Sequence, residues 1–177
     1  QQAAFLPGIV AGETTWCIGM SEPDAGSDLA SLKTSAERQG DMFVINGQKI
    51  WTSFGAVSDY CYLIARTDPD APKHAGLSEF VVDMRLPGIE VRPIVDMTAN
   101  EHFCEIYFED VRVPAANMVG TLNGSFRQVM RQMEHELVKL GKNATIVVYP
   151  EADHAFANPT GNRYLAGPAE DAWAKTV

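Results

Sequence analysis

The sequence is poor in the features that mark several large protein classes. Its 177 residues include only three cysteines, Cys17, Cys61 and Cys104, which lie far apart and form no CxxC pair. We therefore expect free thiols in a reducing compartment, without a disulfide framework or a zinc site. No apolar run approaches the roughly 20 residues needed to cross a bilayer, and the N-terminus lacks the residue order of a signal peptide. These absences predict a cytoplasmic protein that does not span a membrane.

Basic residues are also scarce, since 14 Lys and Arg stand against 23 Asp and Glu, for a net charge of -9. Such a charge repels a phosphate backbone and an anionic membrane surface, so we expect neither nucleic acid nor a membrane as a partner. The net charge does not exclude a polyanionic CoA ester as a ligand, because local positive groups or a further subunit can bind it. The histidines have no ligand spacing, so no metal is predicted.

Length and composition describe a globular protein with one core and an appendage. Hydrophobic residues make up 46% of the chain and charged residues 21%, as in ordinary soluble domains. The first residue is Gln1 rather than Met. This suggests an excised piece or a processed product.

Short β-branched and aromatic runs, separated by turn residues, dominate the chain from Asp41 to Pro114. They predict a mainly β fold, a small antiparallel β-barrel or sandwich. The dipeptide Asn46-Gly47 lies between two such runs and predicts a hairpin with a type I′ turn. Further strands are predicted over residues 60–66, 78–84, 89–93 and 104–113.

The pattern changes after Gly124, where apolar residues recur every three or four positions and predict an amphipathic helix that ends at Gly141. Residues 144–149 form a continuous run of apolar and β-branched residues, as in a buried parallel strand. A polar loop and a last helix, beginning near Gly167-Pro168, complete the chain. The tail is thus predicted to be a short α/β segment.

Two segments carry the residues suited to chemistry. Residues 16–28 place hydroxyls, a proline turn and a glycine beside a short apolar run, an arrangement that offers N–H and O–H donors to a heterocycle or a phosphate. Taken alone, a Pro-Asp-Ala-Gly sequence is more often only a turn. Residues 47–56 place the Trp51 indole beside two hydroxyl residues, although a single strand tryptophan is more often part of a core.

Together and in this order, the two segments resemble the middle domain of the acyl-CoA dehydrogenase family. That signature is Ser/Thr-Glu-Pro followed by Ala-Gly-Ser-Asp, and then Asn-Gly-x-Lys-x-Trp. The resemblance continues through residues 62–67, 81–89 and 108–114, and covers residues 1 to about 135. It implies an FAD-dependent oxidoreductase of fatty acid metabolism that dehydrogenates acyl-CoA thioesters between their α and β carbons.

The resemblance implies that the isoalloxazine ring of FAD lies along both segments. On the first segment, the backbone from Ile18 through Met20 to Ser21, with the Ser21 hydroxyl, would bind the pyrimidine edge. Ser27 would touch the FAD phosphates or the CoA portion of the substrate.

On the second segment, the resemblance places Trp51 against the flavin ring. Thr52 and Ser53 would reach N5 and O4, where hydrogen bonds favour the reduced flavin. Many relatives have Thr where Ser53 stands and Asn where Phe54 stands. Neither difference removes a needed donor.

The family's reaction needs a carboxylate that removes the α-proton of the acyl-CoA. In relatives this group belongs to a C-terminal four-helix domain, and an N-terminal helical domain closes the acyl pocket. Only the first helix of the C-terminal domain begins here, and its Glu134 and Glu136 are assigned to the solvated face. We therefore predict no catalytic residue, and we expect the chain alone to be inactive without the helical domains or neighbouring subunits.

From about Leu137 the chain resembles the C-terminal end of a dienelactone hydrolase, an α/β-hydrolase. His154 would match the triad histidine of that family. No Gly-x-Cys-x-Gly or Gly-x-Ser-x-Gly elbow occurs in the sequence, so this histidine has no nucleophile. The predicted regions are a flavin-binding β-domain over 1–123, a helix over 124–141 and a hydrolase-like tail over 142–177.

Three functions follow from these patterns: a dehydrogenase fragment, a non-catalytic flavin- or CoA-binding domain, and a hydrolase fragment. The change near His135 has three explanations, namely a gene fusion, an engineered chimera or a mis-assembled reading frame.

Overall fold

The computed structural model describes residues 2–125, 128, 157, 159 and 164–176. They fall into two compact units, Gln1–Val129 and Met130–Val177. In the second unit the described helix is α3, Ala166–Thr176, with Pro168 in its first turn, which confirms the helix predicted there. Most of the helix predicted after Gly124, and the strand predicted at 144–149, lie outside the described residues.

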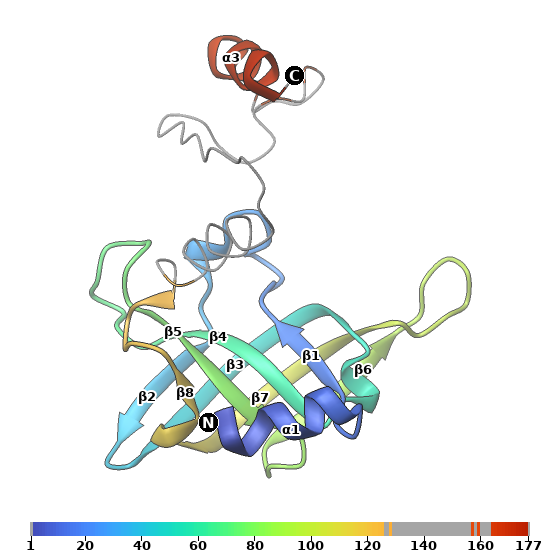
Figure 1. The fold of residues 1–177 in the computed structure, drawn as a ribbon, viewed down its shortest axis with the longest axis vertical. Helices are drawn as coiled ribbons and strands as arrows, with labels where there is room; N and C mark the ends of the chain where they lie inside the picture. Colours follow the sequence, from blue (N-terminus) through green and yellow to red (C-terminus); the bar gives the residue numbers. More distant parts are fainter. Residues whose placement is uncertain (1, 126–127, 129–156, 158, 160–163, 177) are drawn as a thin grey trace. The chain divides into compact units, whose positions relative to one another are not determined.

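The first unit is built on one sheet of eight strands (Figure 1). Its strand order is β6-β7-β3-β2-β4-β5-β8, and β1 pairs with β4. The mainly β prediction is confirmed, but the sheet is open rather than a closed barrel, because its outer strands β6 and β8 do not pair. The strands are β1 Trp16–Gly19, β2 Ser35–Gln39, β3 Met42–Ser53, β4 Tyr60–Arg66, β5 Leu77–Asp83, β6 Ile89–Ile94, β7 Phe103–Pro114 and β8 Met118–Val119.

Strands β4 to β7 lie within one residue of their predicted ends, because each is a β-branched or aromatic run bounded by turn residues. The structure adds strands β1, β2 and β8, which the sequence patterns did not indicate. It also adds helix α1, Gln2–Ala11, and three short 3₁₀ helices, at Leu29–Ser31, Gly55–Val57 and Ala115–Asn117.

The hairpin predicted at Asn46-Gly47 is wrong, because β3 runs through this dipeptide without turning. The β2–β3 hairpin turns instead at Gly40-Asp41, and its paired residues are Gln39 and Met42. Gly47 has a positive φ of 149°, which residues with a side chain rarely adopt, and a Cβ there would lie 2.6 Å from the Cα of Thr34. The glycine is therefore required for the close approach of a neighbouring segment.

The main core lies between strands of the curved sheet, with β4 at its centre. Cys61, Leu63 and Ala65 point from β4 into this core, where Phe43 and Phe80 meet edge to face at 4.9 Å. Ile64 points to the other side of β4 and packs with Ala25, Leu32 and Leu77 in a smaller cluster. Side chains of β4 are therefore buried on both of its sides. These apolar contacts stabilise the position of β4 in the sheet.

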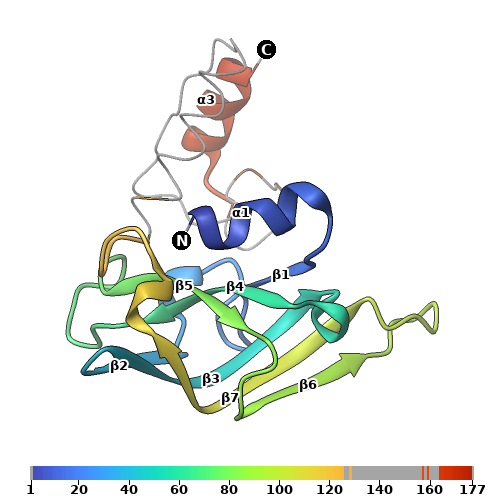
Figure 2. The same ribbon diagram turned by 60° about the horizontal axis from the view of Figure 1, so that its bottom comes forward.

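Helix α1 lies beside β1 (Figure 2). The Phe5 ring contacts the rings of Trp16, at 5.7 Å, and Tyr60, at 5.3 Å, in edge-on geometry. None of the residues of α1 is buried, although nearly all are apolar. The helix is thus attached to the sheet mainly through one aromatic side chain.

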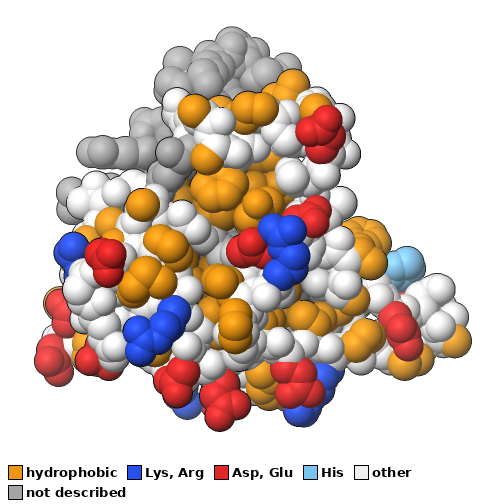
Figure 3. Space-filling view, turned by 90° about the horizontal axis from the view of Figure 1, so that it is seen from below, with side chains coloured by type: hydrophobic (Ala, Val, Ile, Leu, Met, Phe, Trp, Pro, Cys, Tyr) orange, Lys and Arg blue, Asp and Glu red, His pale blue; other side chains and the backbone are white. Residues whose placement is uncertain are grey.

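The surface mixes charged and apolar groups. On the face in Figure 3, Lys and Arg side chains stand in small groups among Asp and Glu. In the described part of the chain, no helix is long and apolar enough to cross a membrane. The same residues contain no group of three or more His, Cys, Asp or Glu placed to hold a metal ion.

Candidate functional site

A groove of about 340 Å³ lies where β1 and the loop after it meet the end of β3. We call it the Trp51 groove. The structure brings five of the seven predicted FAD-contacting residues together there, namely Ile18, Met20, Ser21, Trp51 and Ser53. The remaining lining residues are Trp16, Cys17, Ile50 and Phe54.

A β-bulge in β3 shapes this groove. Lys49 pairs with Ile106 of β7 and Thr52 with Cys104, so β3 has one residue more than its partner in this interval. Trp51, in the bulge, adopts φ of 60° and is 58% exposed, with its indole edge-on to Phe103 at 6.1 Å. A bulky residue in the left-handed region is uncommon. The bulge thereby directs a large aromatic surface toward solvent at the groove.

The loop after β1 is held by β3 through two backbone carbonyls. The N–H of Ile50, freed from β7 by the bulge, donates to the Ser21 carbonyl at 2.9 Å. The ammonium group of Lys49 donates to the Met20 carbonyl at 3.0 Å. The two sequence motifs are thus joined by hydrogen bonds as well as by the groove they share.

A buried ion pair lies beneath this loop. Lys49 is 0% exposed and Glu22 is 7% exposed, and their side chains meet at 2.9 Å. Glu22 also accepts hydrogen bonds from the backbone N–H groups of Lys33, at 2.6 Å, and Thr34, at 2.9 Å. Every charged oxygen and the ammonium group therefore have protein partners, as buried charges require.

The environment acts on the pKa of both partners. Burial alone would raise the pKa of Glu22, but the attraction of Lys49 and the hydrogen bonds from Thr34 and Lys33 outweigh it and lower that pKa. Burial lowers the pKa of Lys49, and Glu22 opposes this effect. The Glu22 carboxylate is consequently ionised at neutral pH.

Neighbouring residues of β3 face opposite sides of the strand. Ser53 lines the Trp51 groove, whereas Thr52 is 1% exposed and does not line it. The Thr52 hydroxyl is buried, and it has no hydrogen-bond partner among the residues that the structure describes. The alternation of side chains along a strand accounts for this difference.

Ser27 lies apart from the residues of the groove, in the exposed loop between β1 and β2. Beside it, Asp28 accepts hydrogen bonds from Lys73, at 2.6 Å, and Ser31, at 2.6 Å, and these lower its pKa. Ser27 is thus available for a contact away from the ring-binding part of the site.

Sequence reasoning missed the two charged residues that support the groove. Glu22 and Lys49 both stand in the quoted motifs, yet charged residues are rarely fully buried, so their pairing was not expected. The weak signal was the position of each: Glu22 directly follows Ser21, and Lys49 is two residues before Trp51.

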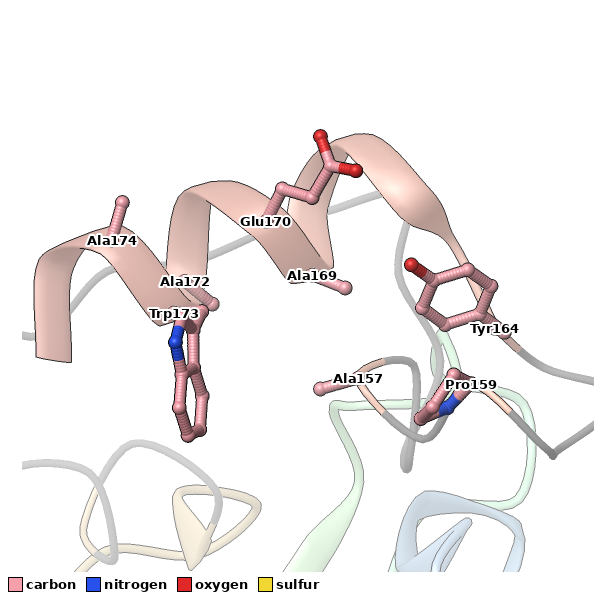
Figure 4. A pocket seen from close by; sticks show the side chains of 8 residues that line it. All are labelled: Ala157, Pro159, Tyr164, Ala169, Glu170, Ala172, Trp173 and Ala174. Carbon is pink, nitrogen blue, oxygen red and sulfur yellow. The ribbon is translucent and has the colours of Figure 1, made fainter.

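The second unit has a cavity of about 480 Å³ beside α3. Figure 4 shows the rings of Trp173 and Tyr164 beside small side chains, with the Glu170 carboxylate directed away from the Trp173 ring. No Ser, Cys or His is among its lining residues. His154 of the hydrolase-like segment lies outside the described residues. The described lining therefore contains neither the Ser or Cys nucleophile nor the histidine of a hydrolase triad.

Family models match the chain in two overlapping parts. The acyl-CoA dehydrogenase middle-domain model matches residues 17–111, which include every residue that lines the Trp51 groove except Trp16. The dienelactone hydrolase family model matches residues 101–177. The second match also includes β7, which the structure places in the sheet of the first unit.

Similar curated proteins are acyl-CoA dehydrogenases. The Mycobacterium tuberculosis acyl-CoA dehydrogenase FadE29 is 42% identical over 163 residues, which are 92% of this chain and 42% of FadE29. The mitochondrial isovaleryl-CoA dehydrogenase of Pongo abelii is 33% identical over 159 residues, or 88% of this chain and 38% of that protein. The chain thus spans about two fifths of these relatives.

Solved structures agree with this assignment. A structure described as the Tcur3481-Tcur3483 steroid ACAD has a TM-score of 0.72 at 42% identity, over 79% of this chain and 36% of that one. The ChsE4-ChsE5 complex from M. tuberculosis has a TM-score of 0.71 at 44% identity, over 76% and 35% of the two chains. The fold and groove define a dehydrogenase-type β-domain, and the chain belongs to the acyl-CoA dehydrogenase family.

Proposed function

We propose that this chain supplies the flavin-ring and CoA-side contacts of an FAD-dependent acyl-CoA dehydrogenase. The observation that carries this proposal is the convergence of Ser21, Trp51 and Ser53 on one groove from two separate segments. An exposed indole beside hydroxyl groups suits a flat heterocycle with a polar edge. The donor set of the Trp51 groove therefore fits an isoalloxazine ring.

We assign the residues of the groove by their positions. The backbone from Ile18 to Ser21 and the Ser21 hydroxyl bind the pyrimidine edge, Trp51 packs on the ring, and the Ser53 hydroxyl reaches N5 and O4. Thr52 contributes through its backbone, because its side chain is buried. Ser27 contacts the FAD phosphates or the CoA portion from the neighbouring loop.

In the parent enzyme, bound FAD accepts two electrons as an acyl-CoA thioester is dehydrogenated. This chain's residues would bind and orient the ring beside the substrate. No carboxylate is among the residues lining the Trp51 groove. We therefore assign the base that removes the α-proton, and the acyl pocket, to helical domains or to a neighbouring subunit.

Two alternatives use the same chain. A non-catalytic flavin- or CoA-binding domain would use the same groove without turnover. A hydrolase fragment is favoured only by the family match at residues 101–177. Free, buried cysteines in the first unit support the proposed cytoplasmic location, because they suit a reducing compartment.

Titration of the purified chain with a flavin tests the proposal. We expect flavin fluorescence to be quenched on binding, and Trp51→Ala to weaken binding at least tenfold. Trp173→Ala is the matched control, since Trp173 is also an exposed tryptophan, at 76% against 58% for Trp51, but lies outside this groove. Bleaching of bound flavin by an acyl-CoA would identify an enzyme rather than a binder, and ester cleavage would favour the hydrolase. Absence of any flavin binding would overturn the proposal.

A further inference from the structure

A contact of the preceding carbonyl determines the direction of the Ser21 N–H, a backbone donor in the loop after β1. None of the described peptide bonds is cis, so the N–H of Ser21 points opposite to the carbonyl of Met20. That carbonyl accepts from the buried ammonium of Lys49. The Ser21 N–H therefore points away from Lys49, and no acceptor for it is found within the described residues.

Glu22 and Lys49 together determine this orientation. Glu22 holds the Lys49 ammonium at 2.9 Å and is itself anchored by the N–H groups of Lys33 and Thr34. The stem of Lys49 lies close to Gly19, where a Cβ would make an ordinary contact of 3.4 Å with the lysine Cγ. The same Cβ would lie only 2.9 Å from the Cys61 sulfur, so the absence of a side chain at Gly19 accommodates β4 rather than the lysine.

A contribution to the stability of the fold does not by itself explain why Lys49 and Glu22 form a buried ion pair. Replacing a buried ion pair by apolar residues of similar volume is often neutral or stabilising, because desolvation offsets the attraction between the charges. A buried ammonium group does, however, donate hydrogen bonds in fixed directions. One N–H of Lys49 donates to the carbonyl of Met20, in the loop that lines the groove.

We propose that the Lys49–Glu22 ion pair is a positioning device, which turns the Ser21 N–H into the Trp51 groove to bind the polar edge of a flavin ring. This inference rests on the proposed function. Neither charged side chain lines the groove, so both act through the Met20–Ser21 peptide. They are positioning residues, and the ligand contact belongs to Ser21.

The test compares two double variants of the full chain, with riboflavin as the probe. Lys49→Met/Glu22→Gln removes both buried charges, while the glutamine oxygen can still accept a backbone N–H. Lys33→Met/Asp24→Asn removes an exposed pair whose side chains are 75% and 76% accessible. We expect the buried-pair variant to bind riboflavin at least tenfold more weakly, and the exposed-pair variant to stay within twofold of the unmodified chain.

A spectroscopic readout separates positioning from a purely structural role. In the unmodified chain, we expect riboflavin to move the ¹H–¹⁵N resonance of the Ser21 amide downfield. The same amide in Lys49→Met/Glu22→Gln should not move, even where urea unfolding shows a folded protein. If that variant does not fold, a Ser21 amide that riboflavin does not move in the unmodified chain would still overturn the proposal.

The outcomes distinguish the two proposals. Absence of riboflavin binding by the unmodified chain would overturn the proposed function and this inference with it. Binding without movement of the Ser21 amide, or equal binding by the folded buried-pair variant, would overturn only the positioning role of Lys49 and Glu22.

Discussion

At the scale of single residues, the site depends on which face of β3 each side chain occupies. Thr52 and Ser53 are adjacent, polar and similar in size, but only Ser53 lines the Trp51 groove. Thr52 instead places a hydroxyl in the core without a partner among the described residues. Burial of such a group is unfavourable, so this residue does not contribute to stability through its hydroxyl.

We predict that Thr52→Val stabilises the first unit by about 1 kcal/mol, because it removes an unpaired buried hydroxyl while keeping a β-branched side chain. Ser53→Ala should change stability by less than about 0.5 kcal/mol, as for other exposed substitutions. Flavin binding should weaken in Ser53→Ala and stay unchanged in Thr52→Val. Urea unfolding and flavin titration measure the two effects, and a destabilised Thr52→Val would show that its hydroxyl is bonded.

At the scale of elements, Glu79 joins β5 to the segment that follows β8. Its carboxylate is 0% exposed and accepts hydrogen bonds from Tyr62, at 2.6 Å, Ser125, at 3.0 Å, and Gln128, at 2.6 Å. These three donors are neutral. Burial, and then the Glu79 carboxylate, raise the pKa of Tyr62 well above its ordinary value.

We predict that Tyr62→Phe destabilises the protein by about 1.5 kcal/mol near neutral pH, since it removes a hydrogen bond to a buried charge. The folded-state pKa of Tyr62 lies above its unfolded value of about 10. The contribution is therefore complete below that pH and is lost as the pH rises further.

Urea unfolding of Tyr62→Phe and the unmodified chain should show a difference in stability that shrinks above about pH 10. Tyr60→Phe is the control on the same strand, because Tyr60 packs its ring on Phe5 and Trp16. A constant difference at all pH values would contradict the role assigned to the Tyr62 proton.

At the scale of the whole molecule, we predict that the chain alone holds FAD weakly. The family resemblance implies that helical domains and a neighbouring subunit grip part of the adenosine half, whereas the Trp51 groove serves the ring. Gel filtration of the FAD-loaded chain should separate protein from most of its flavin. A stoichiometric yellow protein after the column would be incompatible with this prediction.

We also predict no acyl-CoA dehydrogenase turnover by this chain. Loss of a positioned general base alone lowers rates by roughly 10²–10⁴-fold, and the acyl pocket is assigned to other domains. The assay is reduction of an electron acceptor by an acyl-CoA in the presence of FAD. A rate proportional to protein concentration would disprove it.

Deletion of residues 142–177 should leave the free energy of unfolding of the first unit within about 1 kcal/mol and reduce aggregation. The apolar run at 144–149 has the composition of a strand from the interior of a parallel sheet, which also favours pairing between molecules. A truncation series with urea unfolding measures this. A clearly lower midpoint together with a smaller m-value would mean that the tail is integrated with the core.

The sequence by itself determined the family and four of the eight strands, and it predicted the residues of the candidate site. Strands β4 to β7 follow local alternation and turn residues, which are properties of short segments. The two motifs identified the residues of the groove because their order along the chain is specific, even though neither segment is specific alone.

Only the tertiary structure decided how these residues act. Gly47 lies in a continuous strand because Thr34 packs against it, and Thr34 is distant in the sequence. Likewise, the burial of Lys49, the inward face of Thr52 and the open edges of the sheet depend on which strands become neighbours. These features arise from long-range packing, and a local pattern of residues contains no information about the atoms it will meet.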